Sequence, residues 1–553
     1  MQKIDLIKIY QRKTALVIDD FPDMRGTIRR MLMNFGVAAV EIAGSGDEAI
    51  AFCENRAFDI ILCDYNLGDG KNGQQILEEL RYRGLLKHTG IYMMITAETT
   101  KSMVFGALEY QPDDYLAKPF AQPVLQKRLD RLMLEKAVLF DINQAMDKQD
   151  YARAAALCEQ LGTEAGRYEQ KSLRLKAQCC LKQGRIAEAR AIYERVLKER
   201  PLDWAQIGLG RCLMEMGELD QAESLFRQLI DQKCLCLEIY DCLAEIQCGK
   251  GDIFAAQQLL EHASEISPNA ILRQQLLAEI SQSNGDWERA EKAHRKIVRL
   301  GANSCYESPE NYFNLARCIA TQMRRDDTGN SRRLKEAEEV LERARRRYRD
   351  DEQVRLQTDL ISAELRARAG ELESARHILA AARDRIGDEA PATAVTLGLA
   401  RAFQALGDRA TAQRLLQELT ERHPHDEAIG QAVDRLSDEP LSRKGKEEAV
   451  LLNSQGKQLL AAQQYLQAIA LFGQALRHYP NNIALKLNLL LALVRQMNIG
   501  GANANQLRRC TRLIENIPPL AADHPLHERL HVLWDHVDKL SEQLRAATEN
   551  SVA

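Results

Sequence analysis

Four short apolar segments near the start of the chain each end in a polar or charged residue, and no other feature restricts the fold as strongly. The segments and the residues that follow them are Thr14–Ile18 with Asp19 and Asp20, Ile60–Cys63 with Asp64, Ile91–Ile95 with Thr96, and Asp114–Ala117 with Lys118. Short apolar runs bounded by turn-forming sequence predict strands that are buried on both faces of a parallel sheet.

The residues between these segments predict helices. Helical patterns cover residues 22–33 and 47–55, and a further strand is expected at Ala39–Ala43. Strands that alternate with helices predict a parallel sheet with helices on both faces and right-handed crossovers. Residues 1–12 are a leader that is expected to form a short helix or a loose tail.

The polar residues at the strand ends should meet. In an open parallel sheet ligands collect outside the carboxyl ends of the strands, so we expect Asp64 at the lip of a crevice with its carboxylate exposed. Three carboxylates, one hydroxyl and one ammonium then lie together. Such carboxylates repel one another unless a hard dication lies between them, and oxygen ligands with retained waters suit Mg²⁺. With the lysine and the threonine as further contacts, this edge predicts a site for a transferred phosphoryl group.

Each part of this pattern has a simpler explanation when it is taken alone. Asp19 and Asp20 could cap the helix that follows them, since acidic residues are common before a helix. A lysine before a proline, as at Lys118, is ordinary. The joint pattern of strand ends is specific, and in it residues 13–135 resemble the receiver domain of two-component response regulators.

The resemblance implies a role for each strand-end residue and a flavodoxin-like, five-stranded sheet. It implies that Asp64 is the phosphoacceptor and that the peptide bond from Lys118 to Pro119 is cis. The implied Mg²⁺ ligands are Asp19, Asp20, Asp64 and the backbone carbonyl of Asn66; the implied phosphoryl contacts are Thr96 and Lys118; and the implied switch residues are Thr96 and Tyr115, whose ring turns inward when the threonine shifts.

Two features beside the site concern its loop and its kinetics. The loop Leu67–Gly73 departs from the family, which often has a shorter, proline-containing loop there. Asn66 and Glu98 each stand two residues beyond a site residue, at positions that flank the path of the hydrolytic water in receivers. Polar side chains there leave the path open, and the pair is similar to that of chemotaxis receivers. The resemblance therefore implies a short-lived acyl phosphate.

From Gln122 onward the pattern is helical throughout, and it repeats. An alanine three residues after an apolar residue and four before a bulky one recurs at intervals of 35, 33, 34 and 34 residues, at Ala154, Ala189, Ala222, Ala256 and Ala290. A glycine suited to a tight turn stands five residues before each of the last four, at Gly184, Gly217, Gly251 and Gly285. This period with helix–turn–helix punctuation is typical of tetratricopeptide repeats. Small residues such as Gly210 are expected to let one helix approach its neighbour, and large ones such as Phe226 are expected to fill the space beside the repeated alanine.

The repeats continue less regularly towards the C-terminus. We predict an array of about eight repeats over 136–436 with a loop insertion near 322–334, a hinge at 437–446, and further repeats with a capping helix over 447–553, about nine or ten repeats in all. The amphipathic helix that starts at Gln122 is followed by no glycine- or serine-rich linker, so a stiff junction between receiver and array is expected.

Composition excludes several classes of function. The 553 residues carry a net charge of −4, which favours neither nucleic acid nor an anionic membrane as a partner. Arg345–Arg347 lies among glutamates and is explained as a solvated, salt-bridged face. No apolar run is long enough to span a bilayer and no signal-peptide pattern precedes the receiver, so a cytoplasmic protein is expected. The 13 cysteines lack zinc spacing and are interpreted as small buried hydrophobes.

These features predict a response regulator that catalyses nothing beyond its own phosphoryl transfer and dephosphorylation. A histidine kinase or phosphotransfer protein would phosphorylate Asp64 with Mg²⁺, and the groove of the repeats would bind a protein, such as a kinase or another response regulator, according to the phosphorylation state. Two alternatives stay open: a constitutive scaffold or phosphate sink, and a transcriptional regulator without a recognisable DNA-binding domain.

Overall fold

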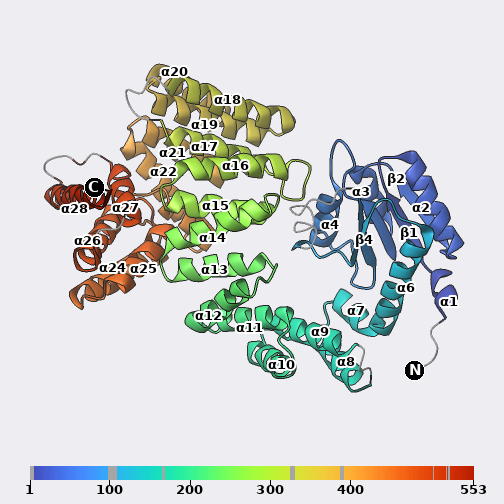
Figure 1. Cartoon of the computed structure of the whole chain (residues 1–553). Coiled ribbons are helices and arrows are strands. Elements are labelled where there is room, and N and C mark those ends of the chain that lie inside the picture. Colours follow the sequence, from blue (N-terminus) through green and yellow to red (C-terminus); the bar gives the residue numbers. More distant parts are fainter. Residues whose placement is uncertain are drawn as a thin grey trace. The chain divides into compact units, whose positions relative to one another are not determined.

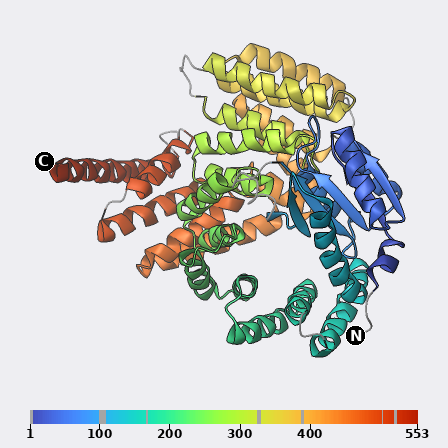
Figure 2. The same cartoon turned by 45° about the vertical axis from the view of Figure 1, so that its right-hand side comes forward.

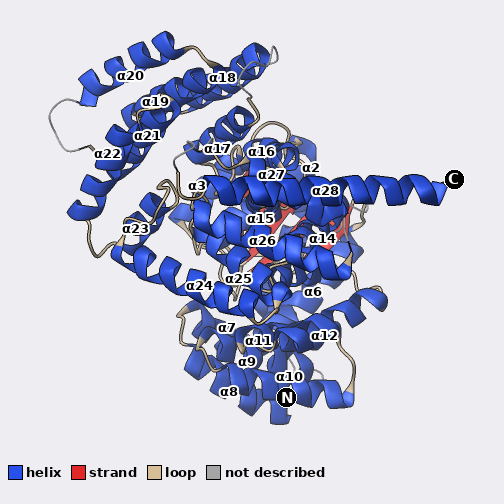
Figure 3. Cartoon of the chain, turned by 90° about the vertical axis from the view of Figure 1, so that its left-hand side faces the viewer, coloured by secondary structure: helices blue, strands red, loops and turns tan. Residues whose placement is uncertain are grey.

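The chain folds into two compact units. The computed structural model describes residues 5–97, 109–164, 168–323, 330–386, 391–501, 504–518, 520 and 524–552. The first unit comprises Met1–Ile246, His262–Ala270 and Leu300–Glu307, and the second comprises Gln247–Glu261, Ile271–Arg299 and Ser308–Ala553. Within the described residues, strands occur only in the first unit, and helices make up nearly all of the rest (Figure 3).

Five parallel strands form the one sheet of the described chain, and we call this sheet together with the helices on its two faces the α/β domain, which is a part of the first unit. They are β1 (Thr14–Ile18), β2 (Ala39–Ala43), β3 (Ile60–Asp64), β4 (Ile91–Thr96) and β5 (Asp114–Ala117), in the spatial order β2-β1-β3-β4-β5. The labels β1, β2 and β4 mark the sheet in Figure 1. Every residue of the central strand β3 is buried, which explains its uninterrupted apolar sequence. Cys63 lies opposite Ile18 and Asp64 lies opposite Ile95, so the ends of β1, β3 and β4 meet at one edge.

The pleat of the strands sends alternate side chains into two hydrophobic cores. On one face, Ala15 and Val17 of β1 pack with side chains of α1 (Leu6–Tyr10), α2 (Pro22–Asn34) and α6 (Gln122–Val138). On the other face, Leu16 and Ile18 pack with side chains of α3 (Gly46–Asn55) and α4 (Gly73–Tyr82). The two helical layers and the twisted sheet between them can be followed at the blue end of the chain in Figure 2. The predicted fold class is confirmed.

The α/β domain continues without a linker into the first helix of the repeat region. Helix α6 ends at Val138, and after one residue α7 (Phe140–Asp147) begins. The carboxylate of Asp147 accepts hydrogen bonds from the backbone N–H groups of His88, at 2.6 Å, and Thr89, at 3.4 Å. The boundary predicted at residue 135 therefore falls inside a helix, and α7 is fastened to the α/β domain at both of its ends.

The remainder of the described chain consists of helices. They are α8 (Tyr151–Glu164), α9 (Glu169–Lys182), α10 (Ile186–Glu199), α11 (Asp203–Glu215), α12 (Leu219–Asp231), α13 (Glu238–Gly249), α14 (Ile253–Ile266), α15 (Ile271–Ser283), α16 (Trp287–Gly301), α17 (Pro309–Thr321), α18 (Asn330–Arg347), α19 (Glu352–Ala369), α20 (Leu372–Ile386), α21 (Thr393–Ala405), α22 (Arg409–Arg422), α23 (Glu427–Asp434), α24 (Arg443–Ala461), α25 (Tyr465–His478), α26 (Ile483–Gly500), α27 (Ala504–Glu515) and α28 (His527–Val552).

Glycines on α11 allow its neighbours to approach closely. A Cβ on Gly208 would lie 2.3 Å from the ring of Tyr193 of α10, and a Cβ on Gly210 would lie 2.4 Å from the ring of Phe226 of α12. Each aromatic ring thus fills the space that a missing side chain leaves on the adjacent helix. The repeat pattern predicts the close approach of helices at Gly210, and the structure adds that Phe226 is the side chain in contact there.

The turns between paired helices share one backbone conformation. Six glycines adopt a φ between +67° and +90°: Gly184, Gly217, Gly251, Gly285, Gly370 and Gly407. Gln149 and Gln463 occupy the corresponding place, five residues before Ala154 and Ala468, and adopt a φ of +57° and +60°. Residues other than glycine rarely adopt this left-handed backbone conformation, because it costs them free energy. The packing of the helices therefore imposes the left-handed turn even where the sequence supplies no glycine.

The loop insertion predicted near 322–334 is shorter than expected. Helix α17 ends at Thr321 and α18 begins at Asn330, and residues 324–329 lie outside the described residues. Asn330 and Leu334 are buried, because the first turn of α18 is part of the hydrophobic core of these helices.

The hinge predicted at 437–446 is also shorter, since α24 begins at Arg443 with Ser442 as its N-cap. The carboxylate of Asp434, at the end of α23, accepts hydrogen bonds from the backbone N–H groups of Leu441, at 2.7 Å, and Ser442, at 2.9 Å. The connection is therefore held by a buried polar network rather than left loose.

One described helix, α26, is long and apolar enough to cross a membrane by length and composition. The helix is not an uninterrupted apolar run, because Lys486, Asn488 and Arg495 lie within it. Of the 18-residue window, 56% is buried inside the protein, and Leu489, Leu490 and Leu493 belong to a core shared with α25, α27 and α28. This helix packs as the centre of the C-terminal helical core.

Candidate functional site

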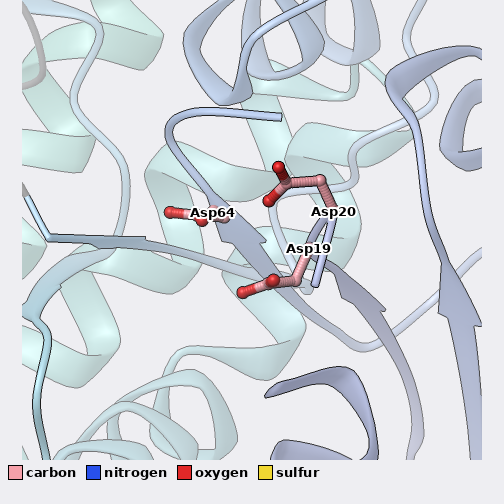
Figure 4. A group of neighbouring side chains, drawn as sticks. All are labelled: Asp19, Asp20 and Asp64. Atoms are coloured by element: carbon pink, nitrogen blue, oxygen red, sulfur yellow. The ribbon is translucent and has the colours of Figure 1, made fainter. Parts of the chain in front are cut away.

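Three carboxylates meet at the carboxyl edge of the sheet. Asp19 and Asp20 follow β1, and Asp64 is the last residue of β3. Each offers one oxygen, and these oxygens all lie within 4.8 Å of one another. Figure 4 shows the three side chains converging from the ends of the two strands. The strand ends thus bring together the acidic residues that the sequence singled out.

Lys118 joins two of these carboxylates. Its Nζ donates hydrogen bonds to Oδ2 of Asp19 at 2.7 Å and to Oδ2 of Asp64 at 2.8 Å. Asp19 is 1% exposed and Asp64 is 6% exposed. The expectation of an exposed carboxylate at Asp64 is therefore wrong: β3 is the central strand, and the residues that follow β1 and β5 cover its end.

Burial and charge oppose each other in this pair. Burial raises the pKa of Asp64, and the hydrogen bond and charge of Lys118 only partly counter that rise. Burial alone would lower the pKa of Lys118, but its hydrogen bonds to Asp19 and Asp64 outweigh burial and leave that pKa above the ordinary value. The lysine is therefore cationic at neutral pH.

The cluster has the chemistry of a site for a hard cation. Three carboxylates face one ammonium, so the group of four has a net charge of 3 × (−1) + 1 = −2 when all are ionised. Oδ1 of Asp20 is buried and accepts no hydrogen bond from the described residues. A buried, unpartnered carboxylate oxygen is costly unless a cation or water satisfies it. The residues present therefore fit a divalent cation with oxygen ligands.

Asn66 opens the loop that leads from β3 to α4. Its side chain is exposed, and its Oδ1 accepts a hydrogen bond from the N–H of Gly68 at 3.4 Å. The loop ends at Asn72, which caps α4 in a capping box with Gln75. Glu98, the second residue expected to influence hydrolysis, lies outside the described residues.

The two switch candidates lie on β4 and β5. Thr96 is 1% exposed, and its carbonyl accepts a hydrogen bond from the N–H of Lys118 at 2.7 Å. The peptide bond from Lys118 to Pro119 is cis. Tyr115 is half-buried beside the core that contains Tyr92, and it also lines a cavity of about 720 Å³ together with side chains of α6 and α9. Tyr115 therefore packs against a hydrophobic core and also borders this cavity.

Sequence reasoning missed the residues that fix the loop after β3. The N–H of Gly73 donates to the carbonyl of Tyr65 at 2.8 Å, and a Cβ on Gly73 would lie 2.3 Å from the carbonyl oxygen of Asp64. The hydroxyl of Tyr92 donates to the carbonyl of Gly73 at 2.7 Å. A signal was present in the sequence, because asparagine followed three residues later by glutamine, as at Asn72 and Gln75, predicts a capping box.

Features elsewhere agree with the structural interpretations made for them. All 13 cysteines are free thiols, and most are buried. Arg345 pairs with Asp359, and Arg346 pairs with Glu342 at 3.2 Å. These arginines therefore belong to ion pairs on the surface of the helical region.

A five-stranded parallel sheet with three carboxylates and a lysine at its carboxyl edge defines the receiver class of signalling domains. Residues 15–130 match the family model of the response regulator receiver domain. Residues 145–207, 181–234 and 395–426 match models of the tetratricopeptide repeat. The chain belongs to the response regulator family, with a receiver domain followed by tetratricopeptide repeats.

Chemotaxis proteins are similar to the receiver domain of this chain. Chemotaxis protein CheY-3 of Vibrio cholerae serotype O1 is 30% identical over 117 residues, which are 21% of this chain and 88% of that protein. Chemotaxis protein CheY of Pseudomonas aeruginosa is 29% identical over 117 residues, 21% of this chain and 93% of that protein. The solved structure of CheY4 of Vibrio cholerae is 27% identical, covers 22% of this chain and 97% of that structure, and gives a TM-score of 0.20.

Proposed function

We propose that this protein is a response regulator that is phosphorylated on Asp64 and whose repeats bind a partner protein according to the phosphorylation state. The observation that supports the proposal most directly is the meeting of Asp19, Asp20 and Asp64 with Lys118 at one edge of the sheet. The donor is a histidine kinase or a phosphotransfer protein, and the protein acts in the cytoplasm. Its own phosphoryl transfer and dephosphorylation are the only reactions it catalyses.

In the transfer step an oxygen of the Asp64 carboxylate attacks the phosphorus of a phosphohistidine. The P–O bond to Asp64 forms, the P–N bond to the donor imidazole breaks, and the imidazole leaves with the electron pair. Lys118 lies 2.8 Å from Oδ2 of Asp64 and supplies positive charge where the phosphoryl oxygens gather. Thr96, at the end of the adjacent strand, supplies the hydroxyl that contacts the same group.

Asp19, Asp20, Asp64 and the backbone carbonyl of Asn66 would hold Mg²⁺, which when bound neutralises the charge that develops on the phosphoryl group. Asp19 is already oriented, because its Oδ1 accepts a hydrogen bond from the N–H of Phe21 at 2.9 Å. The buried Oδ1 of Asp20 accepts no hydrogen bond from the described residues, so a bound cation would satisfy it.

The output is protein binding by the helical repeats. Paired helices that repeat along the chain form grooves that bind peptides or helices of other proteins. Tyr115 is placed to transmit the change, because it lines the cavity that it shares with α6 and α9 of the first unit. A histidine kinase or a second response regulator is a fitting partner.

The phosphorylation step is tested by incubating the full chain with radiolabelled acetyl phosphate. We expect Mg²⁺-dependent labelling that hydroxylamine removes, as it does from an acyl phosphate. Asp64→Asn should abolish labelling, and Asp69→Asn, an exposed acid in the same loop, should label as the wild type does. Labelling of Asp64→Asn at the wild-type level would overturn the proposal.

The output step is tested by affinity capture with the wild type and Asp64→Ala, each with and without beryllofluoride. We expect one partner whose capture by the wild type changes with beryllofluoride and whose capture by Asp64→Ala does not. Equal capture in all four samples would favour a constitutive scaffold. Salt-dependent retardation of one DNA fragment would instead favour a transcriptional regulator.

A further inference from the structure

A turn of the repeat region lies against α4, the helix that follows the loop from Asp64. We call Leu300–Glu307 the docking turn; it belongs to the same compact unit as the α/β domain. The side-chain amide of Gln75 donates hydrogen bonds to the carbonyl of Leu300 at 3.1 Å and to the carbonyl of Ala302 at 3.2 Å. The connection after α16 that contains this turn can be found beside α4 in Figure 1.

The docking turn is held in shape by its own hydrogen bonds. The hydroxyl of Ser304 donates to the carbonyl of Gly301 at 2.8 Å, and the N–H of Asn303 donates to the carboxylate of Glu307 at 2.8 Å. Gly301 and Ser304 are buried, and the other residues of the turn are half-buried. A preorganised turn loses little conformational entropy when it docks, so a few hydrogen bonds suffice to hold it.

The surface of α4 near the docking turn carries a buried acid. Glu78 is 9% exposed, and its Oε1 has no hydrogen-bond partner among the described residues. Burial raises the pKa of Glu78, against the effect of hydrogen bonds from Tyr110 and Gln74. The charge of Glu78 adds to burial in raising the pKa of Tyr306 on the docking turn to about 12.

One further contact joins α4 to the docking turn, and another joins the residue after α14 to the segment before β5. The rings of Tyr82 on α4 and Tyr306 on the docking turn lie 6.5 Å apart, centroid to centroid, at an angle of 55°. The hydroxyl of Ser267 donates to the carboxylate of Glu109, which precedes β5, at 2.9 Å. The docking therefore combines polar and aromatic contacts along α4 and beyond it.

Gln75 connects the docking turn to the phosphoacceptor loop. While its amide nitrogen binds Leu300 and Ala302, its Oε1 accepts the N–H of Asn72 at 2.9 Å in the capping box. Asn72 ends the loop that starts after Asp64, and the next N–H, that of Gly73, is bonded to the carbonyl of Tyr65. A shift of Asn72 therefore acts on one end of the Gln75 side chain, while the other end of that side chain binds the docking turn.

We propose that the docking turn senses the state of Asp64 through Gln75, so that phosphorylation of Asp64 and docking of the turn alter each other's free energy. This inference rests on the proposed function, because it takes phosphorylation of Asp64 as the input. Such a coupling is reciprocal: the factor by which the phosphoryl group changes docking equals the factor by which docking changes affinity at Asp64.

The substitution Gln75→Glu isolates the coupling. Glutamate keeps the acceptor oxygen that completes the capping box, but it loses the NH₂ group that donates to Leu300 and Ala302. Gln126→Glu, on the exposed side of α6, adds the same charge away from the turn and is the matched control. Tyr306→Ala disturbs the contact from the other side and leaves the cap of α4 intact.

The experiment measures amide hydrogen exchange in the full chain during titration with beryllofluoride and Mg²⁺. In the wild type and in Gln126→Glu we expect exchange in residues 300–307 to change by about fivefold or more at saturation. In Gln75→Glu and Tyr306→Ala this response should be lost. The beryllofluoride concentration that gives half of the full protection of residues 64–72 should shift by a similar factor in these two variants.

The outcomes separate this inference from the function on which it rests. Residues 64–72 could become protected while the exchange rates of residues 300–307 and the beryllofluoride midpoints change by less than about twofold in all four proteins. That result would refute the coupling and leave the proposed function standing. If beryllofluoride leaves residues 64–72 of the wild type unchanged, the proposed function fails, and the coupling fails with it.

Discussion

The ammonium of Lys118 lies 2.8 Å from Oδ2 of Asp64, and both side chains are largely buried. The same ammonium holds Asp19, so its removal would leave two buried carboxylates without a cation. We predict that Lys118→Met lowers the stability of the α/β domain by about 3 kcal/mol, measured from hydrogen exchange of the β1 and β3 amides. Saturating Mg²⁺ should restore part of this loss, because a divalent ion can replace the missing charge.

The matched control is Lys13→Met. Lys13 lies 2.7 Å from Asp59, but this pair is partly exposed, so its loss should cost less than about 1 kcal/mol. Equal losses for the two substitutions would contradict the role given to Lys118.

Two glutamines in the repeat turns have a left-handed backbone conformation, and we predict that replacing either one with glycine stabilises the protein. Gln149 and Gln463 adopt φ values of +57° and +60°, which cost a side-chain-bearing residue about 1–2 kcal/mol. Part of the gain from glycine is offset by its greater freedom in the unfolded chain. We therefore expect Gln149→Gly and Gln463→Gly each to stabilise the protein by about 0.5–1 kcal/mol in denaturant titrations. Gln463→Ala should change little, and Gly407→Ala should destabilise.

The close approach of α11 and α12 predicts a rescue experiment. Because a Cβ on Gly210 would lie 2.4 Å from the ring of Phe226, Gly210→Ala should destabilise the first unit by about 1–3 kcal/mol. The double variant Gly210→Ala with Phe226→Leu should recover part of this loss, since the smaller side chain makes room. Gly26→Ala, in a helix with open space around it, should be neutral or stabilising; a comparable loss there would argue against steric crowding as the cause.

Lys486 in α26 predicts an alkaline rise in stability. Burial lowers the pKa of this lysine to about 8, and its Nζ donates to the carbonyl of Asn516 at 2.8 Å. The unfolded chain, with a lysine pKa near 10.5, therefore binds more protons than the folded one between about pH 8 and 10.5. Stability should rise with pH across this window.

The measurement compares Lys486→Met with the wild type. The difference in unfolding free energy between them should change with pH only within this window, because every other titrating group is common to both proteins. A difference that stays constant from neutral pH to pH 10.5 would show that Lys486 titrates normally.

The exposed side chain of Asn66 predicts a short-lived acyl phosphate. In receivers a polar side chain at this position leaves a path for water to the phosphoryl group, so we expect the acyl phosphate to be short-lived at neutral pH. Replacement by a bulky apolar residue, Asn66→Leu, should lengthen its half-life several-fold by blocking water. The measurement follows loss of label after acetyl phosphate is removed; a wild-type half-life of many hours would contradict the prediction.

The sequence predicts the sheet and its acidic edge because these depend on local patterns. Buried parallel strands must be apolar throughout, and a polar residue directly after such a run must lie at the sheet edge. The repeats are recognisable for the same reason, since the close approach of two helices requires a small residue at a fixed interval, as at Gly210.

What the sequence does not predict depends on contacts between distant residues. The hydrogen bond from Gln75 to Leu300 joins residues 225 positions apart, and no local pattern records it. The turns at Gln149 and Gln463 look like ordinary helix sequence, because the left-handed conformation there is imposed by the packing of the flanking helices. The burial of Asp64 follows from the side chains that cover it, which only the three-dimensional arrangement reveals.

The way α7 is fastened determines where this protein can be divided. Only Leu139 separates α6 from α7, and Asp147 binds the far end of α7 to His88 and Thr89. A fragment cut at residue 135 would lose the last turn of α6 and expose the backbone that Asp147 satisfies. A domain that replaces the α/β domain, in the laboratory or in evolution, would therefore have to be joined after Asp147. It would also have to supply a helix in place of α7, which has 8 residues.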